Sequence, residues 1–236
     1  YLAYTDGVAP RFMLASVLSA MEHRRATGEG QYIDISQAEA AIHFLAPAIL
    51  DFEVNDHVWH RQGNRDLGLA PHGVYPVKGD DQWVAIVCQD DQAWLDFCEV
   101  AGFADLSADP ELKSSAGRLK KCEMLDSLIQ EWSANQDGEA LQSKLVAAGV
   151  AAHIVQNSPE AMVDPQLRHR EHFVSVPHVS MGDFIVEGTR FKLSRTPGGP
   201  KRANPEIGEH NAYVLTEILG YDIDRMADVF ASLAMS

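Results

Sequence analysis

Residues 4–39 read YTDGVAPRFMLASVLSAMEHRRATGEGQYIDISQAE, and this stretch contains the signals that predict the fold class. Tyr4 fits the end of a strand, and a helix follows it. From Phe12 to Met21 the residues are apolar on nearly every side of that helix, which is typical of a helix buried between layers. Basic side chains in the last turn and then Gly28 favour its termination.

A strand and a second helix follow in the same stretch. Residues 31–35 alternate between apolar and polar side chains, which predicts a strand. Ser36 and Glu39 form a capping box, which predicts that a helix begins there. Pro47 then predicts a kink or a break within this second helix. The alternation of strand and helix predicts an α/β layer fold.

Asp6 is the first candidate for chemistry, because it lies where the first helix begins. The helix dipole and the unbonded N–H groups of a first turn favour an ionised carboxylate, which suits a nucleophile or a base. Aspartate is also a common N-cap residue, and position alone favours that structural role.

Composition excludes several classes of protein. The chain has 236 residues, 46% of them hydrophobic, so it can bury the core of one or two domains. Its net charge of -15 argues against a nucleic-acid-binding protein. No apolar run approaches the roughly 20 residues of a membrane span, and the sequence shows no secretory signal pattern. Cys88, Cys98 and Cys122 lack CxxC spacing, which predicts reduced thiols and a cytoplasmic setting.

The middle of the chain predicts a small α+β domain. A polar connector at 54–69 has no clear period. Residues 73–76 and 82–87 then predict a β-hairpin. Asp90 is expected to cap a helix that begins at Asp91, a second helix is expected near residue 119, and Asp137 is expected to open a third, with a return strand at 152–155. Further on we expect a brief helix from Ser158, a helical connector at 164–171, strands at 173–176 and 184–186, an irregular segment at 196–200, and helices at 211–219 and 223–233.

Two other groups of residues are weaker candidates. The loop from Gln62 to Leu69 contains Gly63 and Gly68, which permit close backbone approach to a ligand or a mobile lid. A plain connection between domains is the commoner use of such a loop. The histidine pairs His57 with His60 and His169 with His172 could share a metal, but neither has a carboxylate at a recognised spacing. Solvated histidines and no metal are therefore expected.

Motifs spread along the whole chain resemble the CoA-transferases of family III. This group includes the formyl-CoA, carnitine and benzylsuccinate CoA-transferases, with α-methylacyl-CoA racemase as a relative. The residues that carry the resemblance, in family order, are Tyr4-Thr5-Asp6, Glu22 to Ser36 with Glu39, Gly63-Asn64, Ala70 to Pro76, Trp83 to Ile86, Asp164 to Leu167 with Arg170, and Gly208-Glu209-His210-Asn211.

The resemblance implies a catalytic role for Asp6. In the family, this carboxylate attacks an acyl-CoA thioester to give a mixed anhydride, and CoA thiolate then forms an aspartyl-CoA thioester that passes CoA to an acceptor acid. The substrates would be a CoA thioester and a small carboxylic acid, with no tightly bound cofactor. The implied substrate and lid loop contains Gln62, Gly63, Asn64, Gly68, Leu69 and His72.

The resemblance also implies an architecture, a partial Rossmann-like large domain with an inserted small α+β domain, in interlocked homodimers. The amino-terminal half of the large domain, which supplies most CoA contacts in the family, would lie outside these residues, so we expect the later part of a longer polypeptide. The implied division is 1–53 for a large-domain segment with Asp6, 54–69 for a linker and loop, 70–160 for the small domain, 161–180 for a linker, and 181–236 for a segment that returns to the large domain.

Two other functions remain open from the sequence. Asp6 could act as a base in α-proton exchange of an acyl-CoA, as in the racemase relative, with a histidine from the missing half. Alternatively, the chain could be a non-catalytic binding or assembly fragment.

Overall fold

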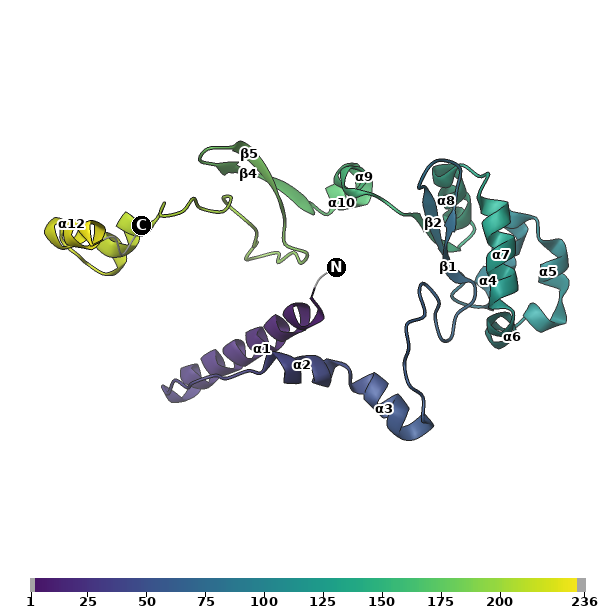
Figure 1. Ribbon diagram of the computed structural model, residues 1–236, viewed down its shortest axis with the longest axis horizontal. Helices are drawn as coiled ribbons and strands as arrows, with labels where there is room; N and C mark the ends of the chain where they lie inside the picture. Colours follow the sequence, from purple (N-terminus) through teal and green to yellow (C-terminus); the bar gives the residue numbers. More distant parts are fainter. Residues whose placement is uncertain (1–2, 233–236) are drawn as a thin grey trace. The chain divides into compact units, whose positions relative to one another are not determined.

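The computed structural model describes residues 3–232, in two compact units that divide between Gly68 and Leu69. Helices and strands both contribute, in the order drawn in Figure 1, and the predicted α/β class is confirmed. Among residues 3–232 no helix has both the length and the apolar character needed to cross a membrane.

The first unit is helical. It contains α1 (Tyr4–Thr27), α2 (Gln37–Phe44) and α3 (Ala46–Asn55). Helix α2 packs against α1, and the rings of Phe12 and His43 meet edge-on with centroids 5.5 Å apart. The predicted end of the first helix is confirmed, because Gly28 takes the left-handed conformation and its N–H bonds the carbonyl of Arg24. Gly28 suits this conformation because it has no Cβ.

The predicted break at Pro47 is also confirmed. Helix α2 ends at Phe44, and α3 begins at Ala46 with Pro47 in its first turn. Proline is accepted there because its missing N–H would have no partner within the helix.

Two expectations for the first unit are wrong. Residues 31–35 form no strand, since a strand needs a hydrogen-bonded neighbour and neither sheet of the described chain includes them. Tyr4, expected at a strand end, already lies in α1.

The burial of the first helix is the third wrong expectation. Val8 is the one buried residue of α1, whereas Leu14 and Leu18 are 60% and 56% exposed. No sheet is present within the described part of this unit, so no apolar layer covers those faces.

The second unit contains an antiparallel sheet in the order β1-β2-β3. Strand β1 (His72–Pro76) pairs with β2 (Trp83–Val87), and β2 pairs with β3 (Ala151–Ile154), so that Val84 lies opposite both Tyr75 and Ile154. The predicted hairpin and return strand are confirmed. The helices between β2 and β3 are α4 (Asp91–Ala101), α5 (Ala104–Ala108), the 3-10 turn Pro110–Leu112, α6 (Ser115–Lys120), α7 (Cys122–Ser133) and α8 (Gly138–Ala147).

These helices and the sheet share one hydrophobic core. Val84 and Ile86 of β2 are fully buried, together with Phe97 of α4, Ile129 of α7 and Leu145 of α8. Helix ends follow the sequence signals, because Asp90 and Asp137 accept hydrogen bonds from the first turns of α4 and α8. The residues of this core cluster therefore all lie in the segment of chain from β1 to β3.

Cys88 and Cys98 belong to this core. Both thiols are free and buried, and burial raises the pKa of each to about 12. Cys122 is also free and is half-buried.

The remaining elements of the second unit match the predicted order. They are α9 (Ser158–Val163), α10 (Pro165–His169), the antiparallel pair β4 (Phe173–His178) and β5 (Gly182–Glu187), α11 (Asn211–Tyr213), a π-helical turn (Val214–Ile218) and α12 (Ile223–Ala231). Residues 196–200 are irregular, as expected from their prolines and glycines. Residue 233, the expected end of the last helix, lies outside the described residues.

Candidate active site

Asp6 lies in the first turn of α1 and is exposed to solvent. Ala3, the residue before the helix, provides no side-chain cap, so the first-turn N–H groups are not bonded by a capping side chain. Pro10 lacks the N–H that would otherwise bond the Asp6 carbonyl. The local sequence therefore places a carboxylate at the positive end of a 24-residue helix.

Gln37 brings a second helix to this carboxylate. It is the first residue of α2, and its Nε2 donates to Oδ1 of Asp6 and, at 3.0 Å, to the hydroxyl of Thr5. Ser36 caps α2 by accepting from the N–H of Glu39 at 3.2 Å. Asp6 is thus placed beside the amino-terminal ends of both α1 and α2, where partial positive charge favours an anion.

The two carboxylate oxygens of Asp6 differ in their hydrogen bonding. Among residues 3–232, Gln37 is the one side chain that bonds this carboxylate, through Oδ1. No partner of Oδ2 lies in the described part of the chain. An ionised carboxylate with one fixed oxygen and one available oxygen can act as a nucleophile or as a base.

The loop from Gln62 to Leu69 has turn geometry. The carbonyl of Gln62 accepts from the N–H of Arg65 at 3.2 Å, and Gly63 lies inside this turn with φ +64°. The N–H of Gly68 donates to the Asp66 carboxylate at 2.8 Å. Gln62, Gly63, Asn64 and Gly68 are exposed.

The candidate loop residues divide between the two units. Asp6, Gln62, Gly63, Asn64 and Gly68 belong to the first unit, whereas Leu69 and His72 belong to the second. Leu69 is half-buried, and His72 is the first residue of β1. Within the first unit, the structure joins Gln37 to Asp6 by a hydrogen bond.

The two histidine pairs belong to no group of metal ligands in the described part of the chain. Among residues 3–232 no group of three His, Cys, Asp or Glu side chains is arranged to hold a metal ion. His57 instead contacts Asp51, with Nδ1 2.6 Å from Oδ2.

Asp51 is the acceptor at the centre of a small cluster. Asn55 donates to it at 2.7 Å and the Trp59 indole at 2.6 Å, in addition to His57. These hydrogen bonds, that of Asn55 foremost, lower the pKa of Asp51 to about 2. The cluster ties the segment after α3 back to the helix, so its role is structural.

Comparison with known proteins identifies the family. The sequence profile described as CoA-transferase family III matches residues 1–211. The chain belongs to CoA-transferase family III. The family III chain is 28% identical to the succinyl-CoA--D-citramalate CoA-transferase of Chloroflexus aurantiacus, over 94% of this chain and 55% of the relative. It is 29% identical to the formyl-CoA:oxalate CoA-transferase of Streptomyces avermitilis, over 88% of this chain and 54% of the relative.

A solved structure shares the fold of this family III chain. The CAIB/BAIF family protein from Brucella suis superposes with a TM-score of 0.78 at 22% identity, over 92% of this chain and 56% of that one. The chain therefore spans about half the length of the curated relatives and of the solved structure that it matches.

Gln37 is the residue of the candidate site that sequence reasoning missed in this family III chain. The capping box at Ser36 predicted that a helix begins there and so placed Gln37 in its first turn. Its amide meets Asp6 only because α2 packs on α1 across 31 residues of sequence. The sequence signal available for this residue was a glutamine directly after the predicted N-cap of a helix.

Proposed function

We propose that this protein transfers CoA from an acyl-CoA thioester to a small carboxylic acid, with Asp6 as the nucleophile. One observation carries the proposal. In a family III chain, the carboxylate of Asp6 is exposed at the beginning of α1, with one oxygen held by Gln37. The helix ends supply partial positive charge next to the position where an oxyanion would develop.

The proposed reaction proceeds through covalent intermediates on Asp6. A carboxylate oxygen attacks the thioester carbonyl carbon, the C–S bond breaks, and CoA leaves as a thiolate. This gives a mixed anhydride between Asp6 and the acyl group. The thiolate then attacks the aspartyl carbonyl carbon, the acyl carboxylate leaves, and an aspartyl-CoA thioester remains. Attack by the acceptor carboxylate reverses the sequence, so that CoA passes to the acceptor and the Asp6 carboxylate is restored.

The names of the relatives suggest the substrate class. Citramalate and oxalate, which appear in those names, are small dicarboxylic acids, and the donors there are succinyl-CoA and formyl-CoA. We therefore place a small dicarboxylic acid as the acceptor here. The loop residues Gln62, Gly63, Asn64, Gly68 and Leu69, with His72, would exclude water from the intermediates, because both the anhydride and the thioester are open to hydrolysis.

Trapping with hydroxylamine tests the role of Asp6. The protein is incubated with succinyl-CoA and hydroxylamine, digested, and analysed by mass spectrometry. Hydroxylamine attacks an activated aspartyl carbonyl, so a hydroxamate is expected on the peptide that contains Asp6 and none is expected in Asp6→Asn. Transfer activity with an unmodified Asp6 peptide would refute the nucleophile.

A second measurement separates transfer from proton exchange. Succinyl-CoA is incubated with the protein in deuterium oxide without an acceptor acid. Nucleophilic transfer predicts no enzyme-dependent deuterium at the α-carbon, whereas a base at Asp6 would incorporate it.

The proposal includes a homodimer in the cytoplasm. Reduced thiols fit that compartment, and all three cysteines are free in the structure. Light scattering coupled to gel filtration gives the mass of the assembly, and a mass of one chain would contradict the dimer.

A further inference from the structure

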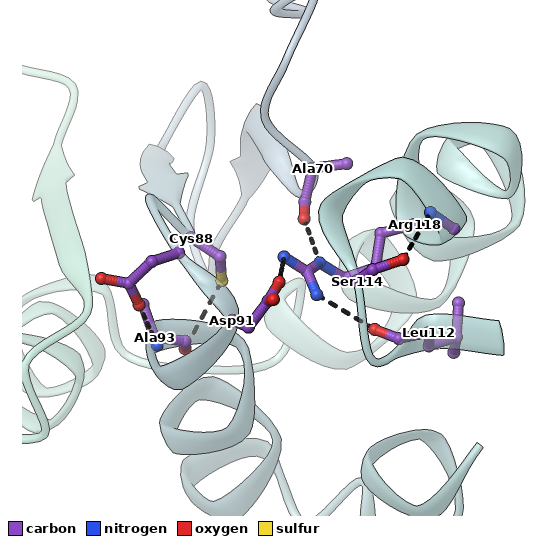
Figure 2. Close-up of polar contacts among 9 residues, drawn as sticks. Ala70, Cys88, Asp91, Ala93, Leu112, Ser114 and Arg118 are labelled. Atoms are coloured by element: carbon purple, nitrogen blue, oxygen red, sulfur yellow. Dashed lines mark hydrogen bonds and ion pairs between the residues drawn. The ribbon is translucent and has the colours of Figure 1, made fainter. Parts of the chain in front are cut away.

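The second unit contains a fully buried arginine that the proposed chemistry does not use. Arg118 of α6 is 0% exposed, and each of the three nitrogens of its guanidinium has a hydrogen-bond acceptor (Figure 2). Nε donates to the carbonyl of Ala70 at 2.7 Å, Nη1 to the carbonyl of Leu112 at 3.0 Å, and Nη2 to Oδ1 of Asp91 at 2.8 Å. A buried charge is tolerated only when it is paired and bonded in this way.

Only the planar fork of arginine suits this position. The three acceptors come from three separate segments, namely the chain before β1, the turn before α6 and the start of α4. The guanidinium also lies over the ring of Trp94, 5.6 Å from its centroid. A lysine ammonium of similar reach is a point charge and could not bond the same three acceptors in one plane.

Ala70 is the residue that follows the candidate lid loop. The carbonyl of Ala70 is bonded by Arg118, and the next carbonyl, that of Pro71, accepts from the N–H of Cys88 at 3.0 Å. Ala70 and Pro71 are both buried, whereas residues 62–68 are exposed. Within two residues, the chain therefore passes from the exposed loop to a buried segment in which the carbonyls of Ala70 and Pro71 each accept a hydrogen bond.

We propose that Arg118 is a positioning residue for the loop from Gln62 to Leu69. By holding the carbonyl of Ala70, it fixes the carboxyl end of the loop to the second unit, so that loop movement is confined to the segment before Ala70. The inference rests on the proposed function, in which that loop keeps water from the intermediates on Asp6. Arg118 touches no reacting atom and acts through the loop.

The first test measures loop fluctuation without using activity. Trypsin cuts after Arg65, inside the loop, and its rate there under native conditions reports how often the loop opens. Arg118→Lys should raise this rate about tenfold, the change expected when one charge-assisted hydrogen bond is lost. Asp91→Asn, which leaves the bond to Ala70 in place, should raise it less than about twofold on the same reasoning.

A matched control separates positioning from general destabilisation. An Ile129→Val or Ile129→Ala variant is chosen to have the same melting temperature as Arg118→Lys, because Ile129 is also buried but its aliphatic side chain donates no hydrogen bond to the carbonyl of Ala70. Equal cutting at Arg65 in this control and in Arg118→Lys would overturn the inference.

A second pair of variants covers the case in which Arg118→Lys does not fold. Two glycines inserted between Leu69 and Ala70 detach the loop from its anchor and leave all three bonds of Arg118 in place. This insertion should reproduce the faster cutting at Arg65. The same insertion between Asp80 and Asp81, in the turn between β1 and β2, should not. Unchanged cutting after the first insertion would overturn the inference.

Activity then separates the two proposals. In the protein that transfers CoA, the glycine insertion after Leu69 and Arg118→Lys should raise the ratio of succinyl-CoA hydrolysis to transfer, and the matched Ile129 variant should not. A wild-type protein without transfer would refute the proposed function, while cutting at Arg65 would still decide whether Arg118 positions the loop. Normal transfer with an unchanged ratio would overturn the inference alone.

Discussion

At the scale of single residues, the amide of Gln37 fixes the direction of the Asp6 carboxylate. Gln37→Ala removes the hydrogen bond to Oδ1 and leaves the proposed nucleophile, Asp6, in place. We expect transfer to slow about 10- to 100-fold through a fall in kcat, because small errors in orientation cost this much. Stability should change by less than about 0.5 kcal/mol, since Gln37 is exposed.

Gln92 provides the control for that prediction. Its Nε2 donates to Asp96 at 2.8 Å on an exposed face of α4. Gln92→Ala removes a similar hydrogen bond far along the sequence from Asp6, so steady-state rates should stay at the wild-type level. Equal losses of kcat in the two variants would contradict a role for Gln37 at the site.

Asp6 and Gln37 also show how far sequence reasoning reaches at this scale. The position of Asp6 in the first turn follows from local signals, and the chemical role proposed for it comes from the family resemblance. The contact of Gln37 depends on helix packing between distant segments, which no local pattern encodes. The burial of Arg118 also depends on distant segments. A charged residue in a short helix is expected at the surface, but Arg118 is buried and donates hydrogen bonds to acceptors from three segments.

At the scale of elements, local capping signals were the most reliable guide. Asp90, Asp137 and Pro47 each set a helix boundary through chemistry within one turn, and the structure has all three boundaries. The strand expected at residues 31–35 failed because a strand depends on a neighbour that alternation cannot supply. The brief helix expected from Ser158 also begins there, and the residue that caps it is Asn157.

The cap of α8 gives a stability prediction. The side chain of Asp137 accepts from the N–H of Ala140 at 2.9 Å. Asp137→Ala should lower the free energy of unfolding by about 1 kcal/mol, measured by urea denaturation. Glu139→Ala, which removes a first-turn charge without a cap bond, should lower it by less than about 0.5 kcal/mol. An equal loss in both would mean that charge rather than capping stabilises this helix end.

The Asp51 cluster after α3 gives a prediction in pH. Its folded pKa of about 2 lies below the usual value of 3.8, so its contribution is present above about pH 3.8 and is lost as the pH falls towards 2. The indole N–H resonance of Trp59, which donates to Asp51, should therefore titrate with a midpoint near pH 2. Asp51→Asn should abolish this titration, and a midpoint near 3.8 would show that the cluster does not hold in solution.

At the scale of the whole molecule, the core occupies only part of the chain. All members of the buried cluster lie between Tyr75 and Val150. A fragment of residues 69–163 contains every residue of this cluster. It also contains Arg118 and the three residues that accept its hydrogen bonds. It should unfold in one cooperative transition by calorimetry, whereas residues 3–68 should not, because most apolar side chains of α1 to α3 are exposed. A gradual transition of the 69–163 fragment would contradict an independent core.

The burial of two thiols has a practical consequence for watching this protein in solution. Cys88 and Cys98 are buried, with pKa values of about 12, so an alkylating dye at neutral pH has little thiolate to attack there. Cys122, at the start of α7, is half-buried and is the remaining thiol of the three. The unaltered sequence thus offers one site for a single fluorescent or spin label on the second unit, and distance measurements between such a label and a second one in the first unit need no cysteine to be removed.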